Sequence, residues 1–201
     1  LQKIFLVGVS LFLINCTTEK NTMYVEKIQN PEFFQSAMQN LTDIIVHDIF
    51  SPPVASRVYL YPTVAAYEII AQKYPDKYNS LVGQVKELST IPSPSDKNVN
   101  YHLASLFAFN TVGKALIFSE NKMELFEKNF KTQLKELNVP SKVIKASEAY
   151  GQAVENNYGE YAYVKLNDII DNYMVGYVGD GKIIQNAKKS DVLFFAKRSL
   201  Q

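Results

Sequence analysis

The sequence predicts an all-α protein, a bundle of about six helices. Apolar residues recur at steps of three and four along several segments, which is the spacing of one face of a helix, and no segment has the strict alternation of a half-buried strand. Prolines stand where three of these segments begin, at Pro31, Pro52 and Pro140. With 201 residues, 47% of them apolar and 20% charged, the chain is long enough to form one domain with a sizeable core.

The first predicted helix begins at Asn30, where Asn30, Pro31 and Glu32 are typical of a cap, a first-turn proline and a first-turn acid. Its polar residues fall on the other faces, so we expect the helix to lie on a core. His47 is placed near the end of this helix, where the helix dipole favours a protonated imidazole. The apolar stripe consists of Phe34, Met38, Leu41, Ile45 and Ile49.

The next segment predicts a buried and kinked helix with the sequence SPPVASRVYLYPTVAAYEII, residues 51–70. Ser51 can cap it, and Pro52 and Pro53 fit its first turn because their missing N–H groups would be unpaired there. Pro62 should kink the helix or split it in two, since it removes one backbone hydrogen bond. Small side chains allow a neighbouring helix to approach closely at Ala55, Ala65, Ala66 and Ala71.

Three further elements follow before the centre of the bundle is complete. A shorter helix is expected from about Tyr78 to Leu88, and the prolines and serines of Thr90 to Asp96 predict a loop. The segment from Asn98 to Phe118 is apolar around nearly its whole circumference, which predicts a helix at the centre of the bundle.

Two more helices complete the predicted bundle. One is amphipathic and begins at Ser119, and the other begins at Pro140. Ser147 and Gly151 lie four residues apart on the inner face of the last helix. Because glycine costs about 1 kcal/mol of helix propensity relative to alanine, we expect Gly151 to serve the close packing of a partner helix.

The first sixteen residues resemble a lipoprotein signal peptide. Lys3 precedes an apolar run from Ile4 to Ile14, which is shorter than the about 20 residues that a membrane span needs. LINC resembles a lipobox, in which Cys16 becomes the lipidated first residue of the mature protein. The expected domains are the signal at 1–16 and a polar tether at 17–29. The predicted location is the periplasm or outer membrane of a Gram-negative bacterium, with the lipid on Cys16 anchoring the protein in the membrane. The alternative is a buried free cysteine.

Charge excludes one class of partner. The net charge is +1 and the basic residues are scattered, so the sequence predicts no nucleic-acid surface. Arginine occurs only at Arg57 and Arg198, which leaves few groups for bidentate recognition of phosphate oxygens. The chain has no tryptophan, the best residue for stacking on a sugar.

Three strings resemble one enzyme family: the string at 51–70, FAFNTVGKALIFSENKMELFEKNF at 107–130, and NYMVGYVGDGK at 172–182. They are similar to the N-terminal half of bacterial vanadium-dependent haloperoxidase-like proteins of the type 2 phosphatidic acid phosphatase superfamily, especially the lipoprotein type of Bacteroidetes. The resemblance covers roughly Asn30 to Lys182, the predicted helical domain. It implies a larger helical bundle that hydrolyses phosphoesters or oxidises halides with peroxide, with vanadate or phosphate as the bound anion.

The resemblance also shows what this chain lacks. In the family, the anion is held by a lysine and arginine pair, a Ser-Gly-His stretch and a later Arg–His element, all in the C-terminal half. A tetrahedral oxyanion needs several such fixed donors. This chain has no Ser-Gly-His string, and its only histidines are His47 and His102. We therefore assign no catalytic, cofactor-binding or metal-binding residue, and no cofactor to this chain.

Other polar residues have structural interpretations. Arg57 is expected to be buried in an ion pair or bonded to backbone, with Glu68 a conceivable partner, and in an intact relative it could approach the anion pocket. Tyr59, Tyr61 and Tyr67 are interpreted as core residues with satisfied hydroxyls. The glycines of GYVGDG, residues 176–181, favour a turn over a phosphate loop.

The residues after Lys182 depart from the family, because 183–201 contain no proline where the family has a proline-rich segment. We interpret 183–201 as a divergent tail produced by a frameshift or premature stop; the alternative is a natural short variant. The predicted function is the scaffold half of a haloperoxidase- or phosphatase-like exported enzyme, inactive alone, with the missing half or a second copy as partner. The alternative is a lipid-anchored helical module that binds a glycan or peptide.

Overall fold

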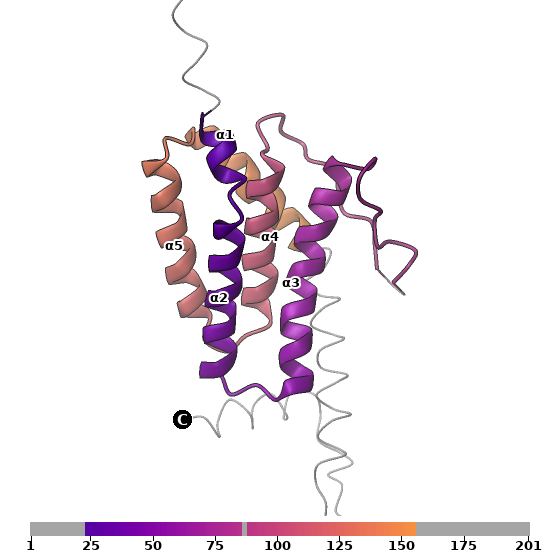
Figure 1. The fold of residues 1–201 in the computed structure, drawn as a ribbon, viewed down its shortest axis with the longest axis vertical. Coiled ribbons are helices and arrows are strands. Elements are labelled where there is room, and N and C mark those ends of the chain that lie inside the picture. Colours follow the sequence, from indigo (N-terminus) through magenta and orange to yellow (C-terminus); the bar gives the residue numbers. More distant parts are fainter. Residues whose placement is uncertain (1–22, 86–87, 156–201) are drawn as a thin grey trace, which may run out of the picture.

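This computed structural model describes residues 23–85 and 88–155, and the described chain is an all-α bundle, as predicted (Figure 1). An isolated bridge between Val82 and Val85 is the only extended pairing within these two ranges. None of the described helices is both long and apolar enough to cross a membrane. The helices are α1 (Met23–Ile28), α2 (Glu32–His47), α3 (Pro52–Lys73), α4 (Tyr101–Ala115) and α5 (Glu120–Glu136), followed by a helical segment whose described part is 141–155.

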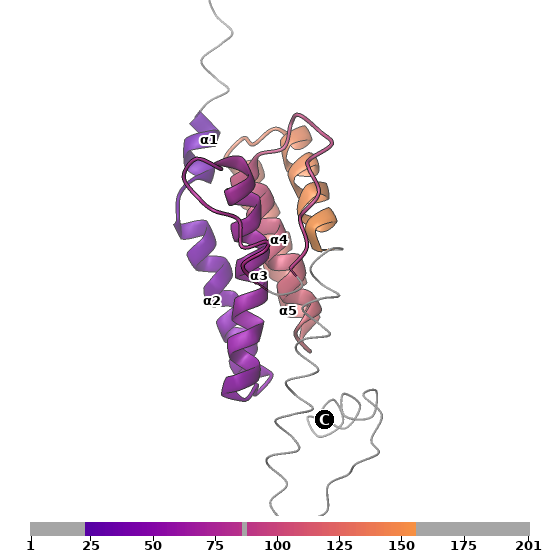
Figure 2. The same cartoon turned by 90° about the vertical axis from the view of Figure 1, so that its right-hand side faces the viewer.

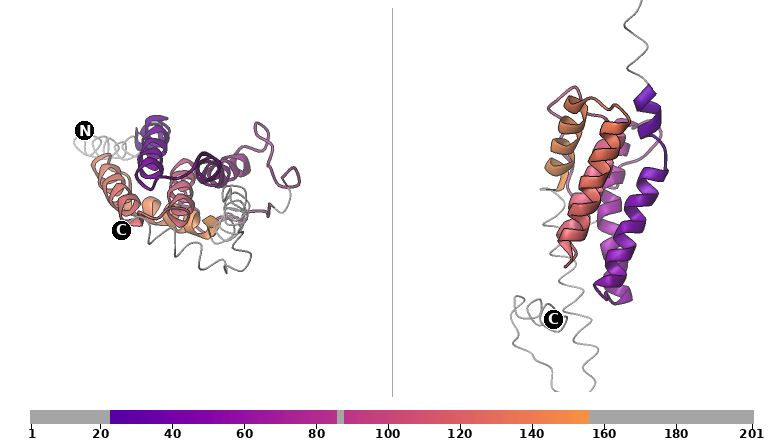
Figure 3. Two further views of the ribbon diagram at one scale, coloured as in Figure 1. Left: turned by 90° about the horizontal axis from the view of Figure 1, so that it is seen from below. Right: turned by 90° about the vertical axis from the view of Figure 1, so that its left-hand side faces the viewer.

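Helix α4 is the centre of the bundle, as its uniform apolarity predicted. It contacts α2, α3 and α5, and α3 packs along it most extensively. The segment 141–155 lies on the opposite side of α4 from α2 (Figures 2 and 3). Most of the α4 side chains are therefore buried, including Leu103, Phe107, Phe109 and Val112.

Helix α3 is one continuous helix, so Pro62 does not split it. Pro52 and Pro53 occupy its first turn, as expected, whereas the hydroxyl of Ser51 makes no capping hydrogen bond. Pro62 is buried and packs toward α4, since its Cγ is 3.7 Å from the position that a Cβ on Gly113 would take. The ring of Pro62 therefore lies beside Gly113 of α4.

The chain before α2 is more structured than the sequence indicated. Residues 23–28, which we assigned to the tether, form α1, and Ile28 at its end is only 2% exposed. The start of α2 lies one residue later than predicted, since Pro31 is its N-cap residue, although Asn30 Oδ1 does accept a hydrogen bond from the Glu32 backbone N–H at 3.0 Å. The joint between α1 and α2 is therefore held against the core.

The prediction of a helix from about Tyr78 to Leu88 is wrong for those of its residues that the structure describes. Residues 78–80 have no regular structure and residues 81–85 form a tight turn, with Gly83 in the left-handed region at φ 81°. The reason is a tertiary contact. The side chain of Glu68 on α3 accepts hydrogen bonds from Ser80 Oγ at 2.6 Å and from the Leu81 backbone N–H at 2.7 Å, which fixes the segment in a non-helical path.

The prediction that Arg57 is buried, with Glu68 as a conceivable partner, is also wrong. Arg57 is exposed on the first turns of α3, and Glu68, at 3% exposure, is committed to Ser80 and Leu81 instead. An arginine near the end of a bundle can extend its guanidinium into water, whereas a glutamate in the middle of a packed helix needs nearby donors. The two side chains therefore have separate roles.

Close packing at the last helix agrees with its small residues. A Cβ on Gly151 would lie 2.7 Å from Phe107 Cβ and 2.8 Å from the Ala108 backbone nitrogen. Ser147 is fully buried, and its Oγ accepts a hydrogen bond from the Asn100 backbone N–H at 2.9 Å. Gly151 and Ser147 together bring this helix against the backbone of α4.

The turn between α2 and α3 contains a strained residue. Ile49 has φ 53°, in the left-handed region that β-branched residues rarely adopt, and its side chain is 74% exposed. The backbone N–H of Phe50 bonds to the Ile45 carbonyl, which closes the end of α2 around this conformation.

We expect Ile49→Gly to raise the free energy of unfolding by about 1 kcal/mol, because glycine adopts a positive φ without steric cost and the lost side chain is exposed. Urea denaturation of the two proteins measures the difference. Val46→Gly is the matched control, since Val46 is also exposed but lies inside α2. That change should instead destabilise the protein, and a destabilised Ile49→Gly protein would contradict the account.

Candidate functional site

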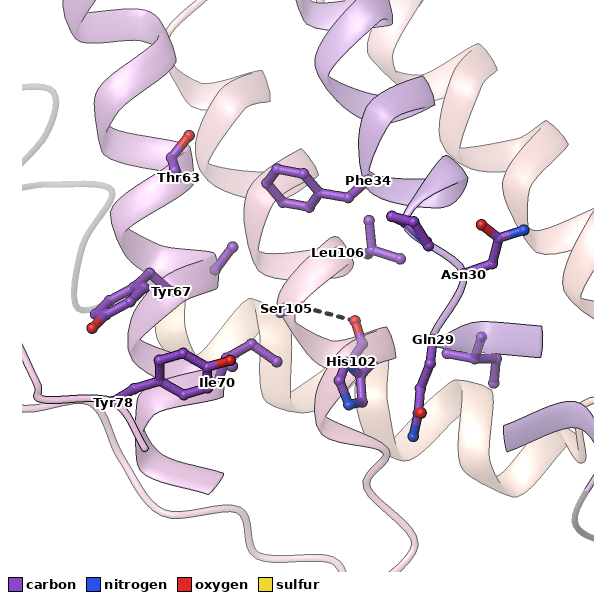
Figure 4. A pocket seen from close by; sticks show the side chains of 13 residues that line it. Gln29, Asn30, Phe34, Thr63, Tyr67, Ile70, Tyr78, His102, Ser105 and Leu106 are labelled. Carbon is purple, nitrogen blue, oxygen red and sulfur yellow. Dashed lines mark hydrogen bonds between the residues drawn. The ribbon is translucent and has the colours of Figure 1, made fainter. Parts of the chain in front are cut away.

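A pocket of about 380 Å³ lies between α3, α4 and the joint of α1 and α2. We call it the His102 pocket. Figure 4 shows Tyr67 and Tyr78 on one side of it, Gln29 and Asn30 on the other, and His102 between them. Its lining consists of Ile28, Gln29, Asn30, Pro31, Phe34, Thr63, Ala66, Tyr67, Ile70, Tyr78, His102, Ser105 and Leu106.

The lining is apolar at its base and contains no aspartate, glutamate, lysine or arginine. Ala66, Ser105 and Leu106 are buried and form the base, whereas Tyr78 is 44% exposed at the rim. Pockets of this kind bind small molecules through apolar contact, with a few polar groups that fix orientation.

His102 is the one ionisable nitrogen base of the pocket. Its Nε2 lies 3.2 Å from the Tyr74 hydroxyl, and the two rings are 6.0 Å apart. Burial lowers the pKa of His102 below its usual value, so the neutral imidazole is favoured. We assigned His102 no role from the sequence. Its position within an apolar helix could have marked it as a candidate, but its contact with Tyr74 depends on how α3 packs against α4.

Ser105 and His102 do not form a nucleophile and base pair. The Ser105 Oγ donates a hydrogen bond to the His102 backbone carbonyl at 2.7 Å, away from the imidazole ring (Figure 4). A hydroxyl nucleophile needs its base within hydrogen-bond reach. The geometry of this pocket therefore supports binding rather than acyl transfer.

The tyrosines of α3 divide between the core and the pocket. Tyr59 donates its hydroxyl hydrogen to Thr42 Oγ1 at 3.1 Å, and Tyr61 is buried, as expected. Tyr67 also has a satisfied hydroxyl, which donates to the Asn79 carbonyl at 2.8 Å, but its ring lines the pocket and packs edge-on against Tyr78. For Tyr67 the interpretation as a core residue alone is therefore incomplete.

The other residues singled out from the sequence lie elsewhere. Arg57 lines neither described pocket. His47 is exposed at the end of α2, and within residues 23–85 and 88–155 no three histidine, cysteine, aspartate or glutamate side chains gather in a possible metal site. Cys16, the 176–181 glycine turn and the 183–201 tail lie outside the described residues.

A second pocket, of about 450 Å³, lies between the loop before α4 and the segment 141–155. Lys142 and Lys145 are on its rim, facing Asp96. Hydrogen bonds from Asn98 lower the pKa of Asp96, so its carboxylate stays charged. All three charges are exposed and therefore strongly screened by solvent. The remaining lining is Ser93, Ser95, Val99, Ala146, Ala149, Tyr150 and Ala153.

Comparison with solved structures identifies the type of fold. The described helices match a structure reported as "the first bacterial vanadium dependant iodoperoxidase" with 42% sequence identity and a TM-score of 0.62. The fold is haloperoxidase-like. The match covers 67% of this chain but only 32% of the iodoperoxidase chain, so this chain spans about a third of that protein. No protein-family model and no curated protein matches the chain.

The haloperoxidase resemblance that the helical strings indicated is thus confirmed at the level of the fold. The described residues do not fit the vanadate that the resemblance implies. One pocket is uncharged, and the other has an aspartate beside its two lysines. An oxyanion with two or more charges needs several fixed cationic or N–H donors aimed at it, and neither described pocket provides them.

Proposed function

We propose that this chain is the N-terminal scaffold of an exported haloperoxidase-like or acid-phosphatase-like enzyme, and that it does not catalyse the reaction alone. The observation that carries the proposal is the 42% identity to the vanadium iodoperoxidase over 67% of this chain. The reaction of the intact enzyme is peroxide-dependent halide oxidation or phosphoester hydrolysis, with vanadate or phosphate as the bound anion.

The scaffold role follows from how the described helices use their polar groups. The carboxylates of Asp48 and Glu68 are buried and bonded to neighbouring chain segments, which fixes the frame and occupies both groups. Arg57 is the one arginine of the described residues, and it is exposed. We propose that in an intact relative this exposed end of α3 faces the anion-binding part.

Activity assays test the proposal directly. The purified chain, supplied with vanadate, iodide and hydrogen peroxide, should form triiodide no faster than the same mixture without protein. With a chromogenic phosphate monoester it should release no product above the blank. A rate that increases in proportion to the chain concentration in either assay contradicts the proposal.

We also propose that the remaining catalytic part is encoded beyond this sequence and was separated from it by a frameshift or premature stop. The support is the departure of 183–201 from the family pattern. Nucleotide sequencing past codon 201, read in all frames, tests this. An in-register continuation with a Ser-Gly-His stretch is the expected result, and unrelated sequence would overturn the proposal.

Export and lipid attachment at Cys16 are further proposals, supported by the Lys3 and apolar-run pattern. Growth of the expressing bacterium with a radiolabelled or alkyne fatty acid should label the protein. Cys16→Ser should remove the label and release the protein from the membrane fraction. Label retained by Cys16→Ser protein contradicts the assignment.

The second candidate function is a self-sufficient binding module, and the His102 pocket is the observation in its favour. A scaffold that lacks its partner should expose apolar helix faces, bind a hydrophobic dye or associate. A self-sufficient module should remain monomeric and unfold in one cooperative transition. Sedimentation together with thermal unfolding distinguishes the two functions.

A further inference from the structure

We propose that the His102 pocket binds a neutral aromatic molecule that carries one hydroxyl group. This binding is independent of vanadate chemistry and of any partner. Three properties of the pocket select that ligand: its aromatic walls, its lack of charge, and the direction of its hydrogen bonds.

The walls are suited to a flat aromatic molecule. Tyr67 and Tyr78 form one wall, with ring centroids 6.4 Å apart and planes at 73°. Phe34 faces the pocket from α2 and is held in place by an edge-on contact with Phe109 at 5.0 Å (Figure 4). Aromatic rings gain from edge-to-face and offset contacts with other rings. Aromatic rings from α2, α3 and the segment after α3 thus line the pocket together with the apolar side chains of Ala66 and Leu106.

The absence of charge excludes ionic ligands. None of the lining residues is acidic, lysine or arginine, and partial burial favours the neutral form of His102. A carboxylate or ammonium group in this pocket would lose its hydration without gaining an opposite charge. The pocket therefore discriminates against anionic and cationic molecules of the same shape.

Three hydroxyl groups of the lining residues already donate their hydrogens within the protein. The hydroxyls of Thr63, Ser105 and Tyr67 each donate their single hydrogen to a backbone carbonyl, at 2.8, 2.7 and 2.8 Å. Their oxygens can then only accept a further bond. A ligand that offers an O–H donor satisfies such an oxygen, whereas an ether at the same position does not. His102 adds one ring nitrogen, Nδ1, for which the described residues provide no partner.

Titration of the full chain with 2-naphthol, followed by its fluorescence, tests the ligand class. We expect saturable binding with a dissociation constant below about 1 mM. Three analogues probe the hydrogen bond and the lack of charge: 2-methoxynaphthalene lacks the donor, 2-naphthoate is anionic, and 2-naphthylmethylammonium is cationic. Each should bind at least about tenfold more weakly, equivalent to about 1.4 kcal/mol. Equal binding of either ion, or of the ether, overturns the proposal.

Two variants test the location. Ala66→Leu places a larger side chain on the base of the pocket and should abolish binding, whereas Ala115→Leu adds the same side chain at an exposed position outside the lining and should not affect it. Tyr78→Ala removes an aromatic ring at the exposed rim and should weaken binding severalfold. Binding that is unchanged in Ala66→Leu and Tyr78→Ala overturns the proposal. The binding experiments contain no vanadate, so a negative result would overturn only the ligand proposal. The activity assays test the scaffold proposal separately.

Discussion

Replacing Gly151 with alanine is expected to lower the free energy of unfolding by about 2 kcal/mol. The new Cβ would lie 2.7 Å from Phe107 Cβ, 2.8 Å from the Ala108 backbone nitrogen and 3.0 Å from the Ala104 carbonyl oxygen. These are backbone or near-backbone atoms, so the two helices must separate. Overpacking costs about 1–3 kcal/mol, and close contacts with atoms that cannot turn aside place Gly151 at the upper end of that range. The helix propensity of alanine returns about 1 kcal/mol, which leaves a net cost of about 2 kcal/mol. The steric effect therefore dominates.

Urea denaturation gives the difference for Gly151→Ala, and Gln152→Ala is the control. Gln152 is the next residue of the same helix and is exposed, so its replacement should change the stability by less than about 0.5 kcal/mol. Gly151→Val should be worse than Gly151→Ala, because its two additional methyl groups meet the same backbone. A Gly151→Ala protein as stable as the original would mean that α4 and the segment 141–155 are not in close contact.

Asp48→Ala should lower the free energy of unfolding by about 3 kcal/mol. Asp48 follows α2 and is 5% exposed, and it joins the end of that helix to the start of α5. Its Oδ2 accepts hydrogen bonds from the Phe118 and Ser119 backbone N–H groups at 2.8 and 3.0 Å, and its Oδ1 accepts one from the Ser119 hydroxyl. Hydrogen bonds to a charged group are worth about 1.5–3 kcal/mol, and alanine leaves the partly buried donors without a partner.

The control for Asp48→Ala removes an aspartate from α2, the helix that Asp48 follows. Asp43 is exposed and bonds only to the nearby Gln39 side chain, at 2.8 Å. Asp43→Ala should therefore cost less than about 0.5 kcal/mol. Asp48→Asn keeps the shape and one acceptor, so its stability should lie between those of Asp48→Ala and the original protein. Equal effects of Asp48→Ala and Asp43→Ala would refute the bridging role.

Elements determined by local pattern could be predicted from the sequence. The apolar stripe from Phe34 to Ile49 predicted α2, although Ile49 itself lies beyond the helix and is exposed, and the amphipathic segment after Ser119 became α5. The small residues Ser147 and Gly151 also indicated the close helix contact correctly. Each of these signals depends only on residues within one helix, which is where periodicity and propensity are informative.

Features determined by contacts between distant segments could not be predicted. The segment after Tyr78 is not the expected helix because Ser80 and Leu81 are hydrogen-bonded to Glu68. No local sequence pattern reveals that Glu68 is their partner. The His102 pocket likewise needs three separate elements to form. Asn110 lies in the apolar central helix and is fully buried. Its side chain has no hydrogen-bond partner among the described residues, and nothing in the described structure explains why a polar residue occupies this position.

The most direct test of the scaffold account is the thermal stability of the purified chain in increasing concentrations of vanadate. A ligand that binds only the folded protein must raise the melting temperature as its concentration exceeds the dissociation constant. The account predicts the same Tm with vanadate as with an equal ionic strength of sodium chloride, because the described pockets lack the donors for an oxyanion. A saturable rise in Tm with vanadate would contradict it.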